Sequence, residues 1–122
     1  MNDEGNLQDA SALAAIAALK DARFPKLTEK NEIDYDAEKT KNKLPLAKIP
    51  VEITVIKVGD QFFVDPLVDE EEQIEARLTV AVTEKGTICA LQKGGELPLS
   101  IEDIETMISI AQKIAPTLRN AL

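Results

Sequence analysis

Regular alternation of apolar and polar residues in the second half of the chain restricts its fold more than any other feature of the sequence. Apolar side chains at every second position are typical of a strand that buries one face. Residues 51–58, 77–82 and 87–92 alternate in this way. A fourth strand-like run, residues 61–65, follows the first. Gly59 and Gly86 lie in the short links within each pair of runs, as expected for hairpin turns. The sequence therefore predicts two hairpins that form a mainly antiparallel, four-stranded sheet, without giving the strand order.

A helix is predicted on each side of these runs. Residues 7–19 repeat apolar side chains at helical spacing, six of them alanines, and Asn6 with Asp9 supplies a capping pattern at the start. The last helix begins at Ser100, which forms a capping box with Asp103. Its apolar residues lie on one stripe: Ile101, Ile104, Met107, Ile108, Ala111, Ile114, Ala115 and Leu118. The predicted class is α+β, with two layers in which both helices pack against one sheet.

The chain is long enough to bury a core, and residues 1–122 are predicted to form a single domain. Within it, residues 26–48 mix many lysines with acidic residues and are predicted to form a charged loop or linker. Lys39, Lys41 and Lys43 make this segment locally basic, so they are candidates for contact with RNA. A charge run is more often simply a solvated segment, and that alternative stays open.

Composition excludes several classes of function. The absence of histidine excludes His-based acid–base catalysis and Ser-His or Cys-His nucleophiles. A net charge of −8 and 3% aromatic residues argue against a freestanding nucleic-acid binder, because phosphates need clustered cations and single strands stack on aromatic rings. No apolar run is long enough to span a membrane, and the start does not resemble a signal peptide. The one cysteine, Cys89, is predicted to be buried, and we expect a cytoplasmic protein without a cofactor.

A cluster of carboxylates between two predicted strands is the one candidate for metal-assisted chemistry. Its members are Asp65, Asp69, Glu70, Glu71, Glu72 and Glu75. Carboxylates grouped in this way can coordinate a divalent cation. A solvated or interface-facing acidic loop is the more common meaning of such a segment, and it is preferred here to a metal site. The last predicted strand ends on Lys93, Gly94 and Gly95, which are expected to form a backbone turn.

Four segments in order carry a resemblance to a known family: DEGNLQDASALAAIAALKDARFPK, VDPLVDEEEQIEARLTVAV, ICALQKGG and the last helix. Together they resemble the C-terminal half of the RNase PH-fold ring subunit of the archaeal exosome that does not itself carry the active site. The resemblance implies a hexameric ring in which this subunit alternates with a catalytic paralogue and helps to hold RNA. It also implies that the first half of the fold has no counterpart in this chain.

The resemblance extends to single positions. Catalytic relatives use two aspartates six positions apart, and the corresponding residues here are Glu71 and Arg77. A guanidinium can neither bind a metal nor act as a base, so Arg77 is expected to form an ion pair with Glu71 or Glu75. Catalytic relatives also carry a phosphate-binding arginine at the start of the first helix, where this chain has Gln8. Both departures imply a non-catalytic, structural subunit.

Two other functions stay open at this point. One is a metal-dependent phosphorolytic ribonuclease that works alone, using Glu71 with Asp65 or Asp69. The other is a small acidic protein-interaction module unrelated to RNA. If half of the fold is absent, the sheet and helices should leave an apolar face uncovered. The alanines of the first helix can be explained by packing on the sheet, and they are also the candidate for that uncovered face.

Overall fold

The computed structural model describes residues 4–122 and contains one four-stranded sheet, as predicted. Its strands are β1 (Val51–Val58), β2 (Gln61–Val64), β3 (Ala76–Val82) and β4 (Ile88–Gly94). The order across the sheet is β2-β1-β3-β4, and every neighbouring pair is antiparallel. The two long central strands, β1 and β3, pair along nearly their whole length, whereas β2 covers only the last part of β1. The first half of β1 therefore has an open edge on one side.

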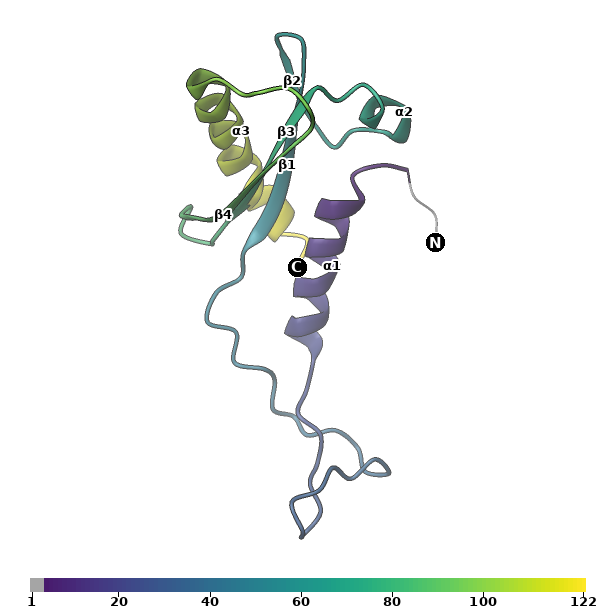
Figure 1. The fold of residues 1–122 in the computed structure, drawn as a ribbon. Helices are drawn as coiled ribbons and strands as arrows, with labels where there is room; N and C mark the ends of the chain where they lie inside the picture. The colour runs from purple at the N-terminus through teal and green to yellow at the C-terminus, as the bar shows by residue number, and fades with distance from the viewer. Residues whose placement is uncertain (1–3) are drawn as a thin grey trace.

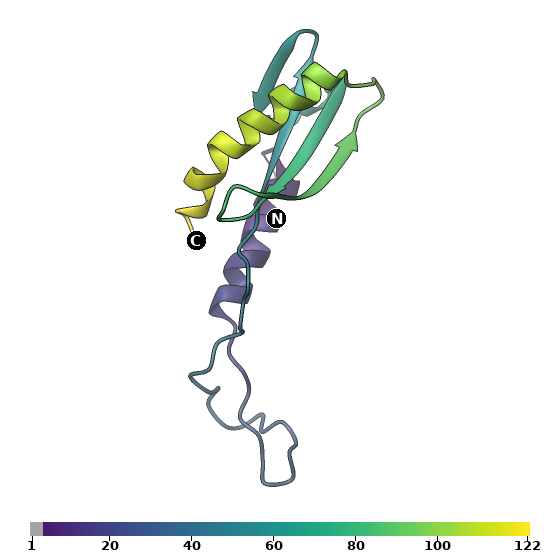
Figure 2. The ribbon, with the colours of Figure 1, turned by 90° about the vertical axis from the view of Figure 1, so that its left-hand side faces the viewer.

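The core lies between one face of the sheet and helix α3 (Ile101–Arg119) (Figure 2). Alternate residues of β1 and β3 point to this face, and the buried side of α3 meets them. The buried members are Val51, Ile53, Val55, Leu78, Val80, Val82, Met107, Ala111 and Ala115. Ser100 caps α3 by accepting from the Asp103 N–H at 3.0 Å, so the predicted capping box is confirmed. Most of the predicted apolar stripe faces the core from Ile104 to Ala115, but its first predicted member, Ile101, is 73% exposed.

Helix α1 (Leu7–Asp21) lies beside β1 near the end of β2, and Figure 1 shows it running from there toward the long loop that follows it. Leu13 is the residue of this helix that packs against the core. The predicted cap is wrong, because Asn6 adopts a left-handed conformation with φ 51° and its side chain makes no capping hydrogen bond. Most of the alanines are exposed: Ala10, Ala14, Ala15, Ala17 and Ala18. Packing on this sheet therefore does not account for them, and the predicted uncovered surface is present.

Residues 22–50, called the arm below, project away from the sheet as a long extended loop (Figures 1 and 2). The arm contains no helix and only two isolated antiparallel bridges, Arg23 with Lys43 and Leu27 with Ile33. Backbone hydrogen bonds join its two sides, among them Phe24 N–H to the Asn42 carbonyl at 3.0 Å. It includes the charged segment predicted over residues 26–48. Lys39, Lys41 and Lys43 all lie on it and are all exposed.

Three details differ from the sequence-based expectation. A short helix, α2 (Val68–Glu71), occupies the carboxylate-rich segment that was expected to be a loop. Strand β4 continues through Lys93 and Gly94, which pair with Leu78 and Arg77, so only Gly95 turns the chain, at φ 80°. Cys89 is exposed rather than buried, because β4 is an edge strand. Within residues 4–122, no helix combines the length and apolar character that crossing a lipid bilayer requires.

Candidate functional site

Asn6, immediately before α1, is the point where the acidic segment meets the first helix. Its backbone N–H donates to Glu71 Oε1 at 2.7 Å, and its side-chain Nδ2 donates to Asp65 Oδ1 at 3.1 Å. The left-handed backbone at Asn6 allows both groups to face the same segment, and asparagine adopts this conformation more readily than most residues. Two carboxylates far away in the sequence are thus held by one residue.

This arrangement bears on the metal site considered from the sequence. Asp65 and Glu71 turn oxygens toward the N–H groups of Asn6, and Glu70 Oε2 accepts from the Leu67 N–H at 2.8 Å as part of the capping box of α2. Residues 4–122 contain no group of three or more Asp, Glu, Cys or His side chains placed to hold a metal ion. Asp65, Glu70 and Glu71 are therefore held by different N–H donors, Asp65 by a side-chain amide and the other two by backbone groups.

Arg77 lies on β3 opposite Gly94, and its side chain occupies the space where a side chain of residue 94 would lie. A Cβ atom added to Gly94 would lie 2.4 Å from Arg77 Nε, so the absence of a side chain is what lets the arginine lie there. The predicted ion pair is absent from residues 4–122, where the structure records one ion pair, between Lys57 and Asp103. Glu71 binds Asn6 instead, and Glu75 Oε2 accepts from the Gly59 N–H at 2.9 Å.

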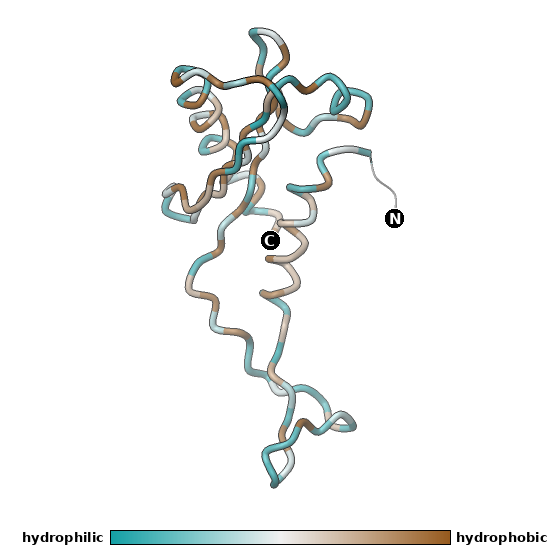
Figure 3. Tube along the Cα trace, viewed as in Figure 1, coloured by the Kyte–Doolittle hydropathy of each residue, from teal (hydrophilic) through white to brown (hydrophobic). Residues whose placement is uncertain are grey.

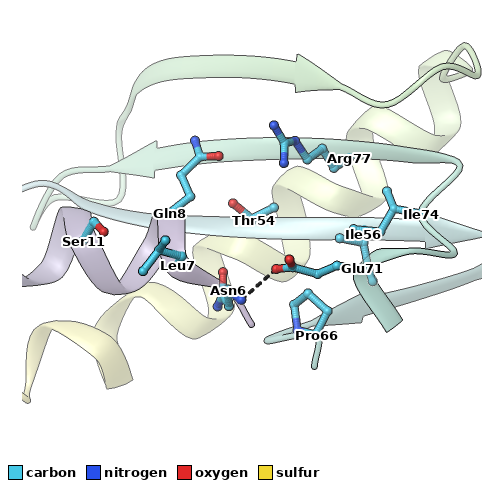
Figure 4. A pocket seen from close by; sticks show the side chains of 10 residues that line it. All are labelled: Asn6, Leu7, Gln8, Ser11, Thr54, Ile56, Pro66, Glu71, Ile74 and Arg77. Atoms are coloured by element: carbon cyan, nitrogen blue, oxygen red, sulfur yellow. Dashed lines mark hydrogen bonds between the residues drawn. The ribbon is translucent and has the colours of Figure 1, made fainter. Parts of the chain in front are cut away.

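A pocket of about 400 Å³, called the Arg77 pocket below, opens between the start of α1 and the sheet. Gln8, Glu71 and Arg77, the three positions singled out by comparison with catalytic relatives, all line it. Figure 4 shows the Gln8 and Arg77 side chains extending over the same part of the sheet, with Glu71 directed at Asn6. The remaining lining residues are Asn6, Leu7, Ser11, Thr54, Ile56, Pro66 and Ile74.

The chemistry available in the Arg77 pocket is limited. Arginine stays protonated and cannot take up a proton from a substrate, and the Gln8 amide has no charge. Glu71 is the one carboxylate among the lining residues, and a single carboxylate does not supply the several oxygen ligands that a divalent cation requires. The pocket can donate hydrogen bonds through Arg77, Gln8 and Ser11, so its geometry suits binding and support better than proton transfer.

The sequence-based reasoning missed a buried carboxylate that attaches α1 to the sheet. Asp9 is 6% exposed and accepts two hydrogen bonds from Thr54, from N–H and from Oγ1, each at 2.7 Å. Thr54 Oγ1 in turn lies 2.9 Å from Thr79 Oγ1. Burial raises the pKa of Asp9 above its ordinary value, although the hydrogen bonds from Thr54 act in the opposite direction. Asp9 thus gives a hydrogen-bond acceptor to the Thr54 N–H on the open edge of β1, next to the point where β2 ends.

The other predicted site residues lie away from this pocket. Lys93 Nζ donates to the Gly95 carbonyl at 2.8 Å, which stabilises the exit from β4. A Cβ atom on Gly95 would lie 2.7 Å from the Glu75 carbonyl oxygen, so both its φ and its surroundings require glycine. The arm lysines lie at the far end of the molecule from α2 (Figure 1).

Comparisons with known proteins agree on one family. Residues 48–114 match the 3′ exoribonuclease family, domain 2. The chain is 41% identical over 116 residues to exosome complex component Rrp42 of Methanothermobacter thermautotrophicus, covering 94% of this chain and 42% of that protein. It is 36% identical over 127 residues to Rrp42 of Pyrococcus furiosus, covering 100% of this chain and 46% of that protein. The chain therefore spans less than half the length of these relatives.

Two solved structures are similar along almost the whole chain. A chain of the Archaeoglobus fulgidus exosome with RNA bound to the active site has a TM-score of 0.82 and 33% identity, over 98% of this chain and 44% of that one. A chain of an archaeal exosome core has a TM-score of 0.83 and 32% identity, over 99% and 46%. These matches include α1 and nearly all of the arm, which precede the matched family domain. Because the matched domain takes in more than half of its residues, this chain belongs to the 3′ exoribonuclease family.

Proposed function

We propose that this chain is a non-catalytic structural subunit, or part of one, in an exosome ring of the RNase PH type. In this role it supports 3′-to-5′ RNA degradation by a catalytic paralogue, which is its partner in a hetero-oligomeric, hexameric ring in the cytoplasm. The names of its relatives support the assembly, since those proteins are exosome complex components. The similar solved chains come from archaeal exosomes, one of them with RNA bound.

The observation that carries the non-catalytic part of the proposal is the set of side chains in the Arg77 pocket. Gln8, Glu71 and Arg77 come together there from α1, α2 and β3. Metal-assisted phosphoryl transfer uses carboxylates to hold divalent cations and positive charge to hold phosphate. In this pocket the positive charge lies on β3 and a neutral amide lies on α1, and one carboxylate is bound to a backbone N–H. That distribution supports a scaffold rather than a phosphorylase.

RNA contact is a further part of the proposal and is indirect for most of the chain. A net charge of −8 repels a phosphate backbone, so the partner supplies most of the positive field. Lys39, Lys41 and Lys43 are exposed on the arm, and we propose them as the residues of this chain that reach RNA within the assembly. No cofactor is needed for this role.

The direct test of the non-catalytic role is a phosphorolysis assay with purified components. RNA and inorganic phosphate are incubated with this chain alone, with a catalytic RNase PH-like paralogue alone, and with both. The proposal predicts no release of nucleoside diphosphates by the chain alone and faster release by the mixture than by the paralogue. Release by the chain alone that disappears in a Glu71→Gln variant would establish the alternative of an independent metal-dependent phosphorylase.

A further inference from the structure

A second pocket, called the Asp9 pocket below, lies between α1, α3 and the open edge of β1 and has a volume of about 380 Å³. Its walls are mainly aliphatic, and Figure 3 shows that most of α1 is apolar whereas the arm that follows is mainly hydrophilic. The aliphatic lining residues are Ala10, Leu13, Ile53, Val64, Ile114 and Leu118. Pockets of this size, with apolar walls and a few polar groups, are typical of small-molecule sites.

Hydrogen bonds hold α1 beside this space at both ends of the helix. Near its start, Asp9 accepts from the N–H and the hydroxyl of Thr54, each at 2.7 Å. Near its end, Lys20 Nζ donates to the carbonyl of Leu122, which follows α3, at 2.6 Å. The walls of the Asp9 pocket are therefore fixed by contacts within the chain, and the pocket is formed before any ligand enters it.

The charged groups of the Asp9 pocket are both carboxylates. Asp9 and Asp65 line it, with Asn6 beside them. Asp9 is 6% exposed and Asp65 is exposed, so one carboxylate lies deep in the pocket and the other lies at its mouth. Burial, and to a smaller extent the charge of Asp65, raises the pKa of Asp9. The two carboxylates are thus close enough for their like charges to act on each other.

No cation of the described chain balances these two charges. None of the described lining residues is basic, and within residues 4–122 neither carboxylate forms an ion pair. Lys20, the one basic residue of α1, donates to Leu122, and Arg119 of α3 donates to backbone carbonyls of the sheet and of the arm. The Asp9 oxygens keep acceptor capacity beyond the two hydrogen bonds from Thr54. The pocket therefore has the charge and the free acceptors to receive a cation.

We propose that the Asp9 pocket binds a small primary alkylamine in its protonated form. The ammonium group pairs with Asp9 and Asp65, and the alkyl chain lies along the aliphatic walls. An ammonium group has several donors and can reach both carboxylates at once. A bare metal ion fits less well, because it requires more oxygen ligands than two carboxylates supply and gains nothing from aliphatic walls. This binding does not depend on the exosome ring proposed above.

The experiment is isothermal titration calorimetry of the whole chain at neutral pH with three probes that share one alkyl chain. Hexylamine is protonated under these conditions, 1-hexanol is neutral, and sodium hexanoate is an anion. Hexylammonium should bind at one site, about 10-fold more tightly than 1-hexanol, because only the amine pairs with the carboxylates. Hexanoate should not bind, because its charge is repelled by Asp9 and Asp65.

Three variants locate the binding in the Asp9 pocket. Asp65→Asn removes the charge at the mouth, and asparagine tolerates the left-handed backbone there, with φ 56°. This variant should bind hexylammonium about 5-fold more weakly and 1-hexanol unchanged. Leu118→Phe fills part of the aliphatic wall and should weaken binding of both probes. The matched control, Asp69→Asn, removes an exposed carboxylate on α2 outside the pocket and should leave both affinities unchanged. Circular dichroism checks that each variant keeps the fold.

Four results would overturn the proposal. The first is a wild-type chain that does not bind hexylammonium. The second is equal affinity for hexylammonium and 1-hexanol, because the pocket would then bind apolar molecules without regard to charge. The third is equal weakening by Asp65→Asn and Asp69→Asn, which would mean that the net negative charge of the chain attracts the amine. The fourth is displacement of hexylammonium by magnesium chloride at equal concentration, which would make the pocket a site for an inorganic cation.

Discussion

Helices α1 and α3 are each attached to β1 by one carboxylate near their first turn, yet only α3 contributes fully buried apolar residues to the core. Asp9 of α1 accepts hydrogen bonds from Thr54, and Asp103 of α3 pairs with Lys57 at 2.7 Å. Helix α3 buries Met107, Ala111 and Ala115 against the sheet, whereas α1 buries only Asp9. Because α1 reaches the core through Leu13 alone and most of its alanines are exposed, it has a free apolar face, and this difference points to a missing partner for α1.

The largest effect is expected from truncating the core side of α3. Met107 is 0% exposed, so Met107→Ala should lower the free energy of unfolding by about 2–5 kcal/mol through lost burial and a cavity. The matched change on α1 is Leu19→Ala, where the side chain is 42% exposed, with an expected loss below about 1 kcal/mol. Urea denaturation measures both. Equal losses would mean that α1 contributes to the core as much as α3 does.

The next effect concerns the attachment of α1. Asp9→Ala leaves the Thr54 N–H and hydroxyl without their acceptor in a buried position, which should cost about 1–3 kcal/mol. Asp9→Asn keeps one acceptor oxygen and should cost less. Amide hydrogen exchange provides the second readout, with faster exchange expected across α1 and unchanged exchange across α3. Faster exchange across α3 as well would contradict the separation between the two helices.

The pH dependence of stability should distinguish Asp9 from Asp103, and this effect is expected to be smaller. Burial raises the pKa of Asp9 above its ordinary value of 3.8, so the folded chain holds this proton more tightly than the unfolded chain. The contribution of Asp9 to stability should therefore fall as pH rises through the window between 3.8 and the raised pKa. The hydrogen bond from Lys57 lowers the pKa of Asp103, so its contribution is present above 3.8 and is lost as pH falls through the lowered pKa.

Urea midpoints across the acidic range test these opposite signs, with each carboxylate removed in turn. The advantage of wild type over Asp9→Asn should shrink as pH rises, and its advantage over Asp103→Asn should shrink as pH falls. The same direction of change in both comparisons would refute the assignment. Wild type and both variants are measured at one salt concentration, because screening weakens the partly buried Lys57–Asp103 pair.

The smallest effect on stability is expected on the free face of α1. Ala14 is exposed, so Ala14→Arg should change the free energy of unfolding by less than about 0.5 kcal/mol. The same substitution at Ala111 of α3, which is 0% exposed, should prevent folding. If α1 faces a partner, Ala14→Arg should nevertheless reduce binding to the catalytic paralogue. Unchanged binding would place the partner on another surface.

Local pattern was sufficient to predict the elements that carry their own periodicity. The three alternating runs became β1, β3 and β4, and the stripe from Ile104 to Ala115 became the buried side of α3, whereas Ile101 is exposed. Helix α2 was missed because four residues are too few to show a period. Cys89 was predicted to be buried because the position of β4 at the edge depends on strand order, which no local pattern contains.

The sequence predicted which residues form the site but not which partners they bind. The positions of Gln8, Glu71 and Arg77 came from the family resemblance, and the structure brings them into one pocket. Their partners could not be predicted, because charge alone favours an ion pair while backbone N–H groups compete for the same carboxylates. Glu71 and Glu75 bind the N–H groups of Asn6 and Gly59 instead. The contact of Asp9 with Thr54 joins residues 45 positions apart in the sequence, and it also depends on where β2 ends.

The mass of a mixture in solution tests the central proposal most directly. The purified chain is combined with a catalytic RNase PH-like exosome subunit and examined by size-exclusion chromatography with light scattering. The account predicts a stable mixed assembly whose mass exceeds that of either component alone. Separate elution of the two proteins, each at the mass it has alone, would contradict the proposal that this chain is a structural subunit of the ring.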